Sequence, residues 1–323
     1  MERTGYTSLQ ELSFSPSFFE DEVRGGFFVS GMMKRCWAAQ LKTLAEIDRI
    51  CRKHHITWYI ETGTLLGAVR HQGFIPWDDD LDISMMREDL ERFLDIAEGE
   101  LTEGYTIGDV RRRDDYLNAN MRIISTESIE EKTTLAFYGF PYSAGVDVFA
   151  LDGVFADEAR ERQRRLDIKE IQEFCGLFEE EEENRQHIDQ GIALLEEKYA
   201  VKIPPEGNRL NAVLKLLIPL FSACSAEEAE DVILFFNWKD DYRLKKAWYA
   251  DTVMLPFEHL LLPAPAGYKE ALTARYRNVR YIGRGGAYHD YPYYTDMENY
   301  YKGIIGHNPY RYTLTAEDMA NRR

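Results

Sequence analysis

The sequence has few cysteines, a minority of positive charges and no long apolar run. Its 323 residues include four cysteines, and none forms a C-x-x-C pair, so a zinc or dithiol redox motif is not expected. So few cysteines in a chain of this size favour a reducing compartment. The most apolar stretch, residues 212–224, contains Lys215 and Pro219 and is too short to cross a bilayer. We therefore expect no transmembrane segment.

The chain opens with polar residues and no apolar core of sufficient length, which predicts no signal peptide. The interpretation is a cytoplasmic protein, with peripheral docking at a membrane left open. The net charge of −17 argues against a nucleic-acid polymer as partner, because such proteins need a basic face to neutralise phosphates. It is compatible with a small phosphorylated ligand held by a few arginines and a cation.

Hydrophobic periodicity predicts an α/β (α+β) fold in the first 150 residues. Apolar residues recur at helical spacing over 32–54, 65–70 and 87–99, whereas β-strands alternate apolar and polar residues. Strand patterns cover 57–61, 80–84, 105–110, 119–125, 134–140 and 145–150. Together they predict one mostly antiparallel or mixed sheet flanked by helices.

The composition changes after Gly153. Residues 156–200 are charged and helical in pattern, further helices are expected over 209–223 and 226–238, and one lies near 267–276 in a part rich in Pro, Gly and Tyr. We expect three parts in consequence: a catalytic core at 1–155, a helical region at 156–245, and a C-terminal segment at 246–323 that completes the catalytic domain and the substrate site.

The most informative stretch is ETGTLLGAVRHQGFIPWDDDLDIS at residues 61–84. Asp80 and Asp82 are two apart on a predicted strand, so their carboxylates point to the same face. Such like charges resist burial unless a cation bridges them, and Mg²⁺ or Mn²⁺ is the natural bridge for oxygen ligands. The alternative interpretation is a surface pair, but the apolar neighbours Leu81 and Ile83 favour burial.

Asp147 lies within GVDVF, a predicted apolar strand. A carboxylate in such a strand is costly without a partner. If this strand lies beside that of Asp80 and Asp82, the three carboxylates converge, and such a triad can hold one or two metals for displacement at phosphorus. Asp147 is also a candidate to accept the proton of an attacking hydroxyl.

Further residues in the same stretch are candidates for binding a phosphorylated ligand. Gly63 and Thr64 mark a strand-to-helix switch, where backbone N–H groups approach an anion closely; an ordinary turn is the alternative. Arg70 and His71 form a cationic pair, and Arg70 is a candidate phosphate clamp or a helix C-terminal cation. Asp78 lies just before the strand, with Asp79; the alternatives are a place at the loop surface, or a role in binding a second metal or orienting a ligand water.

Two other candidates lie outside this stretch. Arg122 alternates with apolar residues on a strand; an inward arginine is a candidate pyrophosphate clamp, and an outward one faces solvent. Tyr288 and His289 lie in GGAYHDYPYY at residues 285–294, where clustered aromatic faces would attract a quaternary ammonium group or simply cover the core.

At these residues the sequence resembles the LicD family of phosphotransferases, whose relatives include the fukutin-type enzymes. The resemblance is dense in GTLLGAVRHQGFIPWDDDLDI, resumes at 122–126 and at GVDVFALD (145–152), and is weaker over 254–276. It implies a nucleotidyltransferase-like fold with a Gly-Thr turn at Gly63–Thr64, a D-x-D strand at Asp80 and Asp82, and a third aspartate at Asp147.

The resemblance also implies an activity. The family's best-known reaction is transfer of phosphocholine from CDP-choline to a sugar hydroxyl of a cell-surface glycan, and fukutin-type relatives transfer ribitol phosphate from CDP-ribitol. We expect a CDP-linked donor, a glycan or lipid-linked glycan acceptor, and release of CMP. The chain departs from the family pattern where relatives show Tyr-Gly-Asp and this chain reads Tyr276-Arg277-Asn278, so the acceptor stays open.

Two alternatives to this function remain at the level of sequence. The same aspartates could transfer a nucleotide to a small molecule, as nucleotidyltransferases do. The chain could instead be a non-catalytic module that binds a nucleotide or a glycan. The intact set of three carboxylates in apolar surroundings favours catalysis over the last alternative.

Overall fold

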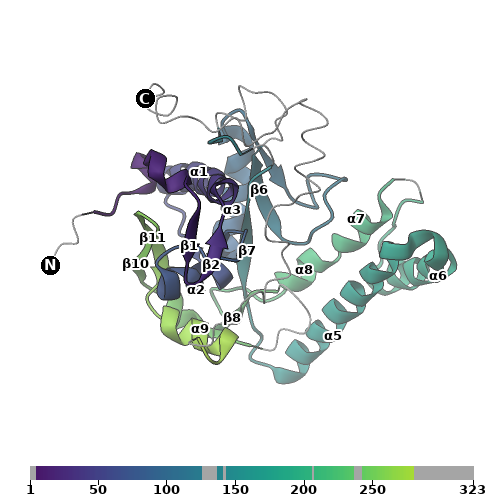
Figure 1. Ribbon diagram of the computed structural model, residues 1–323. Coiled ribbons are helices and arrows are strands. Elements are labelled where there is room, and N and C mark those ends of the chain that lie inside the picture. Colours follow the sequence, from purple (N-terminus) through teal and green to yellow (C-terminus); the bar gives the residue numbers. More distant parts are fainter. Residues whose placement is uncertain (1–4, 126–136, 141–142, 206, 236–241, 280–323) are drawn as a thin grey trace, which may run out of the picture.

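The computed structural model describes residues 5–125, 137–140, 143–205, 207–235 and 242–279 (Figure 1). A twisted mixed sheet stands at the centre, helices pack against it, and a helical arm projects away from it. This arrangement confirms the predicted α/β class.

The central sheet has seven strands, in the order β3-β4-β7-β6-β5, with β8 added to the far end of β7 and β9 to β8. Among its described strands, β4 and β7 pair in parallel and the other pairs are antiparallel. The strands are β3 (Tyr59–Ile60), β4 (Asp82–Met86), β5 (Tyr105–Gly108), β6 (Met121–Ser125), β7 (Gly145–Gly153), β8 (Asp231–Ile233) and β9 (Leu244–Lys245).

Two small antiparallel hairpins accompany this sheet. They are β1 (Glu22–Arg24) with β2 (Phe27–Val29), and β10 (Thr252–Phe257) with β11 (Leu260–Pro265).

The helices fall into a group around the sheet and a group in the projecting arm. Around the sheet lie α1 (Gly31–His54), α2 (Thr62–His71), α3 (Arg87–Glu100) and α9 (Tyr268–Tyr276). The arm and its base contain α5 (Glu158–Cys175), α6 (Glu181–Tyr199), α7 (Arg209–Leu214) and α8 (Leu217–Phe221). Short 3₁₀ turns are η1 (Leu9–Glu11), η2 (Pro16–Phe19), η3 (Gly176–Glu180) and η4 (Lys246–Tyr249).

Local sequence signals define the ends of these helices. Ser30 caps α1, and its side chain accepts a hydrogen bond from the Met33 amide at 3.2 Å. The helix ends at His55, which adopts a left-handed φ of 55°. Asp157 and Asn208 cap α5 and α7 in the same way as Ser30. Such caps satisfy amides that the first turn of a helix leaves without partners.

The buried side chains form one large and two smaller cores. The largest lies between α1, α2, α3, the sheet and the β10–β11 hairpin. A second unites α5, α7 and α8 with Val110 and Phe235. The third covers the β3–β7–β8 end of the sheet around Phe149 and Tyr249. None of the described helices combines the length and the apolarity needed to cross a bilayer.

Several secondary-structure predictions were wrong in whole or in part. In the described part of the expected helix over 226–238, residues 231–233 form the strand β8, because Val232 and Ile233 are buried and the strand pairs with the end of β7. The expected strand over 134–140 is a turn at 137–139, the part of it that the structure describes. The single helix expected over 209–223 is divided into α7 and α8.

Candidate active site

One row of residues crosses four neighbouring strands. Asp82 begins β4, and its Cα partner on the parallel strand β7 is Asp147. Asp147 is paired with Arg122 on β6, and Arg122 with Gly108 on β5. Directly opposed residues of adjacent strands project from the same face. The two carboxylates and the guanidinium group therefore share one face of the sheet, as the predicted convergence of these strands required.

Two threonines at the start of α2 hold Asp82. The Thr62 hydroxyl donates to Asp82 Oδ2, and the Asp82 amide donates to Thr64 Oγ1 at 2.8 Å. The strand-to-helix switch was predicted at Gly63–Thr64, but the residue in the left-handed conformation is Thr62, with a φ of 49°. A β-branched residue rarely adopts this conformation. Sequence reasoning missed Thr62, since no local signal marks it.

A second buried carboxylate, that of Glu61, belongs to a residue that is hydrogen-bonded to Asp82 through the backbone. The amide of Glu61 donates to the Asp82 carbonyl at 3.0 Å, and its side chain caps α2. Glu61 Oε2 accepts hydrogen bonds from the Tyr249 hydroxyl at 2.9 Å and the Ser84 hydroxyl at 3.1 Å. Burial raises the pKa of Glu61, and these donors oppose the rise. Glu61 thus connects the C-terminal part of the chain to the strand that carries Asp82.

Asp78 and Asp80 lie in the loop that leads into β4. Both are half-buried, and β4 itself begins only at Asp82, so Asp80 is not on the strand as predicted. A β-carbon added at Gly63 would lie 2.9 Å from Asp78 Oδ2. Glycine at this position therefore lets the Asp78 carboxylate approach the first turn of α2.

The carboxylates match a small oxygen-seeking cation in donor type and charge. Asp82 is buried, and burial together with the charges of Asp80 and Asp147 raises its pKa. A bound divalent cation would offset this cost of gathering like charges. Within the described ranges, however, no three His, Cys, Asp or Glu side chains are grouped closely enough to hold an ion. Convergence of all three aspartates on a metal stays a prediction.

Asp147 and Arg122 form the more accessible half of the row. Arg122 Nε lies 3.5 Å from Asp147 Oδ1, and their side chains are 38% and 20% exposed. Arg122 therefore points toward the carboxylates and also reaches solvent. The sequence left open whether Arg122 points inward or toward solvent, and the structure shows it beside Asp147.

Arg70 and His71 occupy the last turn of α2. Burial lowers the pKa of Arg70, whereas the nearby Tyr276 and Asp78 act to raise it. Burial, followed by the charges of Arg70 and Arg24, lowers the pKa of His71 to about 4. The predicted cationic pair is therefore reduced to Arg70 at neutral pH, and His71 is a neutral ring edge-on to Trp77.

Tyr276, the last residue of α9, was not among the predicted site residues. Burial raises the pKa of Tyr276 to about 12, with Arg275 lowering it and the charge of Asp82 raising it further. The Tyr276 phenol is thus within electrostatic reach of both Asp82 and Arg70. Its position in the weaker block of family resemblance, 254–276, was the available signal. Tyr288 and His289 lie outside the described residues.

The similarity to known proteins lies in the same region of the chain as this row of residues. Residues 55–162 match the family model described as LicD/FKTN/FKRP, nucleotidyltransferase domain. The lipopolysaccharide cholinephosphotransferase LicD of Haemophilus influenzae is 42% identical over 67 residues, which is 21% of this chain and 25% of that protein. Uncharacterized proteins of Rickettsia typhi and Rickettsia prowazekii are 48% and 47% identical over 64 residues, 20% of this chain and 21% and 24% of theirs. The chain thus matches a quarter or less of the length of these curated relatives.

Proposed function

We propose that the chain is a phosphotransferase, because residues 55–162 match the LicD/FKTN/FKRP family model. It moves phosphocholine, or a similar alcohol phosphate, from a CDP-activated donor to a hydroxyl of a cell-surface glycan or its lipid-linked precursor. The name of the Haemophilus influenzae relative supports the choice of phosphocholine. The scarcity of cysteine supports a cytoplasmic setting.

The observation that carries the proposal is the pairing of Asp82 with Asp147 on adjacent parallel strands, next to Arg122. This row lies within the matched segment, and it gathers two carboxylates and one cation on one face. Phosphoryl transfer depends mainly on positioning and charge stabilisation and needs no covalent nucleophile. The carboxylates and the guanidinium group of this row are suited to positioning the reactants and to stabilising charge.

The reaction is a displacement at the distal phosphorus of the donor. The acceptor hydroxyl oxygen forms a bond to this phosphorus, and the bond from the phosphorus to the bridging oxygen breaks. CMP departs with that oxygen and its electron pair. The hydroxyl proton passes to a carboxylate, and Asp147 is the candidate because it is 20% exposed, whereas Asp82 is buried and held by Thr62.

In this proposal the arginines bind the donor. Arg122, beside Asp147, binds a pyrophosphate oxygen, and Arg70, at the end of α2, binds a second one. Asp82 and Asp147, with Asp80, are the residues that would hold Mg²⁺ or Mn²⁺. When bound, that ion would neutralise charge that develops on the departing CMP.

Product analysis with several donors tests the proposal. The purified protein would be incubated with Mg²⁺ and, separately, CDP-choline, CDP-ribitol and CDP-glycerol, with and without glycan acceptors. Release of CMP from one donor is the expected result and identifies the transferred group. Formation of a cytidylylated acceptor with free phosphocholine would show transfer of the nucleotide instead. Absence of both products with every donor would contradict the proposal.

A further inference from the structure

A buried asparagine of the helical region binds a loop of the sheet. Asn211, on α7, is 1% exposed. Its side-chain nitrogen lies 3.2 Å from the carbonyl oxygen of Val110, and 2.8 Å from those of Arg113 and Tyr116. An amide has two N–H groups, so one of them is shared between two carbonyls. These acceptors precede Asn211 by 95 to 101 residues.

The acceptors all belong to the 109–120 loop, which connects β5 to β6. Val110 is buried in the same cluster as Val213 of α7. On the exposed side, Lys215 Nζ lies 3.1 Å from Asp114 Oδ1. Exposed ion pairs contribute little, whereas the carbonyls bound by Asn211 are wholly or partly buried, where loss of a donor is costly. Among the described contacts, Asn211 is therefore the main polar attachment of the loop to the helical region.

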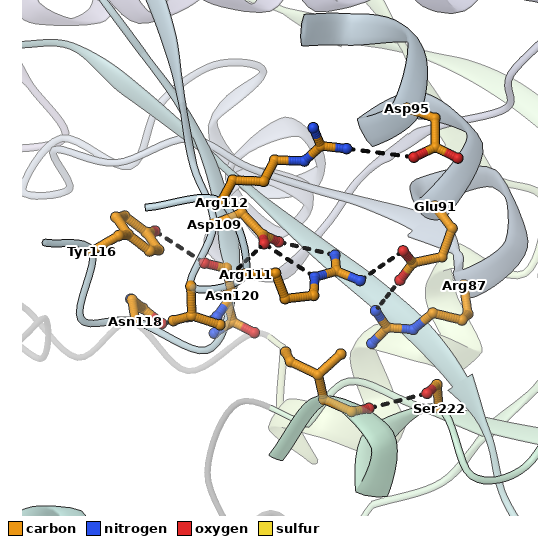
Figure 2. A network of polar contacts seen from close by, with 12 residues as sticks. Arg87, Glu91, Asp95, Asp109, Arg111, Arg112, Tyr116, Asn118, Asn120 and Ser222 are labelled. Carbon is orange, nitrogen blue, oxygen red and sulfur yellow. Dashed lines mark hydrogen bonds and ion pairs between the residues drawn. The ribbon is translucent and has the colours of Figure 1, made fainter. Parts of the chain in front are cut away.

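The opposite side of the loop is attached to α3 (Figure 2). The Arg111 guanidinium binds Asp109 Oδ2 at 2.9 Å and Glu91 Oε2 at 2.7 Å. Glu91 also binds Arg87 at 3.0 Å. These contacts fix the start of the loop, so Asn211 is needed chiefly for the part from Arg113 onward.

That later part carries Tyr116, which lies at the end of the active-site row. The Tyr116 ring packs so closely on Gly108 that any β-carbon there would overlap it, and the hydroxyl donates to the Asn120 carbonyl at 2.9 Å. Gly108 is the strand partner of Arg122. The ring therefore lies beside Arg122 on the same face of the sheet. Burial raises the pKa of Tyr116, Asp147 raises it further and Arg122 lowers it, in keeping with this position.

We propose that Asn211 is a positioning residue for the active site. By fixing the 109–120 loop, it holds Tyr116 over Gly108, where the ring forms the wall of the donor site beside Arg122. The helical region thereby sets the geometry of a row to which it contributes no charge. The inference rests on the proposed function, since the wall borders the site assigned there to the pyrophosphate of the donor.

The test compares Asn211→Ala with a matched control on the same helix. Asn208→Ala removes the cap of α7, since Asn208 accepts from the Asn211 amide at 3.1 Å, and costs about 1 kcal/mol, but it leaves the loop contacts in place. Hydrogen exchange of amides 110–120 in the full chain would be measured without substrate. We expect faster exchange in Asn211→Ala and unchanged exchange in Asn208→Ala. Equal exchange in both variants would overturn the proposal.

Kinetics with Mg²⁺ and CDP-choline provide the second readout. We expect Asn211→Ala and Tyr116→Ala each to lower kcat/KM by about 10- to 100-fold, the loss typical of a small misplacement, while Asn208→Ala stays near wild type. Because both changes act through the same wall, the double variant should lose little more than either single variant. Faster loop exchange with unaltered kcat/KM would refute the positioning role. Inactive wild-type protein would refute the proposed function, and the exchange experiment would still test the loop.

Discussion

The Thr62 hydroxyl donates a hydrogen bond to the buried carboxylate of Asp82, and it does so from a left-handed backbone conformation. A glycine, such as the next residue Gly63, adopts this conformation at little cost, yet position 62 is occupied by a threonine. Strained residues persist where the surrounding structure enforces them, and they concentrate at functional sites. The strain at Thr62 has a function if its hydroxyl orients Asp82.

This relationship predicts that activity depends on the side chain at position 62 more than stability does. Thr62→Gly relieves the backbone strain but also removes a donor to the buried Asp82, which costs about 1–3 kcal/mol. Because these effects oppose each other, its free energy of unfolding should stay within about 1 kcal/mol of wild type. The loss of the hydroxyl should lower CMP release at least about 10-fold. Thr62→Ser keeps the donor and should retain most activity. Urea unfolding and the CMP assay check both halves, and full activity in Thr62→Gly would show that the hydroxyl is dispensable.

The pairing of Arg87 with Asp152 predicts a large effect on stability. Arg87 binds both oxygens of the buried Asp152, at 2.7 and 2.8 Å. Asp152→Ala removes the bidentate partner of the buried guanidinium, which keeps its bond to the partly exposed Glu91, and should cost up to about 3–5 kcal/mol. Asp95→Ala is the control, because that side chain is 84% exposed and pairs with Arg112 at 3.4 Å; it should change stability by less than about 1 kcal/mol. Similar unfolding midpoints for the two variants would contradict a structural role for Asp152.

The lowered pKa of His71 predicts a pH-dependent loss of stability. Its pKa is about 4 in the folded chain and about 6.5 in an unfolded one, because burial and then Arg70 and Arg24 disfavour the charged ring. Between these values the unfolded state binds a proton that the folded state does not, so stability falls as pH drops from about 7 to about 4. The loss is at most about 3 kcal/mol.

A glutamine at position 71 isolates this contribution. His71→Gln carries no titrating ring, so its unfolding free energy should decline less steeply than that of wild type between pH 7 and pH 5. Urea unfolding at three pH values measures both slopes. Parallel slopes would show that His71 titrates normally in the folded protein.

The sequence was sufficient for those parts of the site that depend on local pattern. Apolar spacing predicts the long helix at 31–54 and the strands of Asp82 and Asp147. The position of α2 is predicted by Gly63 and the apolar residues that follow it in the sequence. The adjacency of the Asp82 and Asp147 strands entered the sequence analysis only as a condition, and the pairing of the two residues meets it.

The rest could not be predicted because it depends on contacts distant in sequence. The Asn211 side chain meets its carbonyl partners about 100 residues away, and Glu61 meets Tyr249 at a separation of 188. Residues 226–238 resembled a helix in spacing, but pairing with β7 made their middle a strand. Nothing local distinguishes Thr62 from an ordinary helix-start residue, since its conformation follows from the position of Asp82.

The comparison of Asp82→Asn and Asp147→Asn with wild type tests the central claim most directly. CMP release from CDP-choline would be measured in Mg²⁺, with Asp95→Asn as the exposed control and unfolding curves to verify the fold of each variant. The account predicts at least about 100-fold loss of turnover in both site variants, a cost of about 3 kcal/mol in the activation barrier, and unchanged turnover in Asp95→Asn. Wild-type turnover in a folded Asp82→Asn or Asp147→Asn protein would contradict the assignment of this row as the catalytic centre.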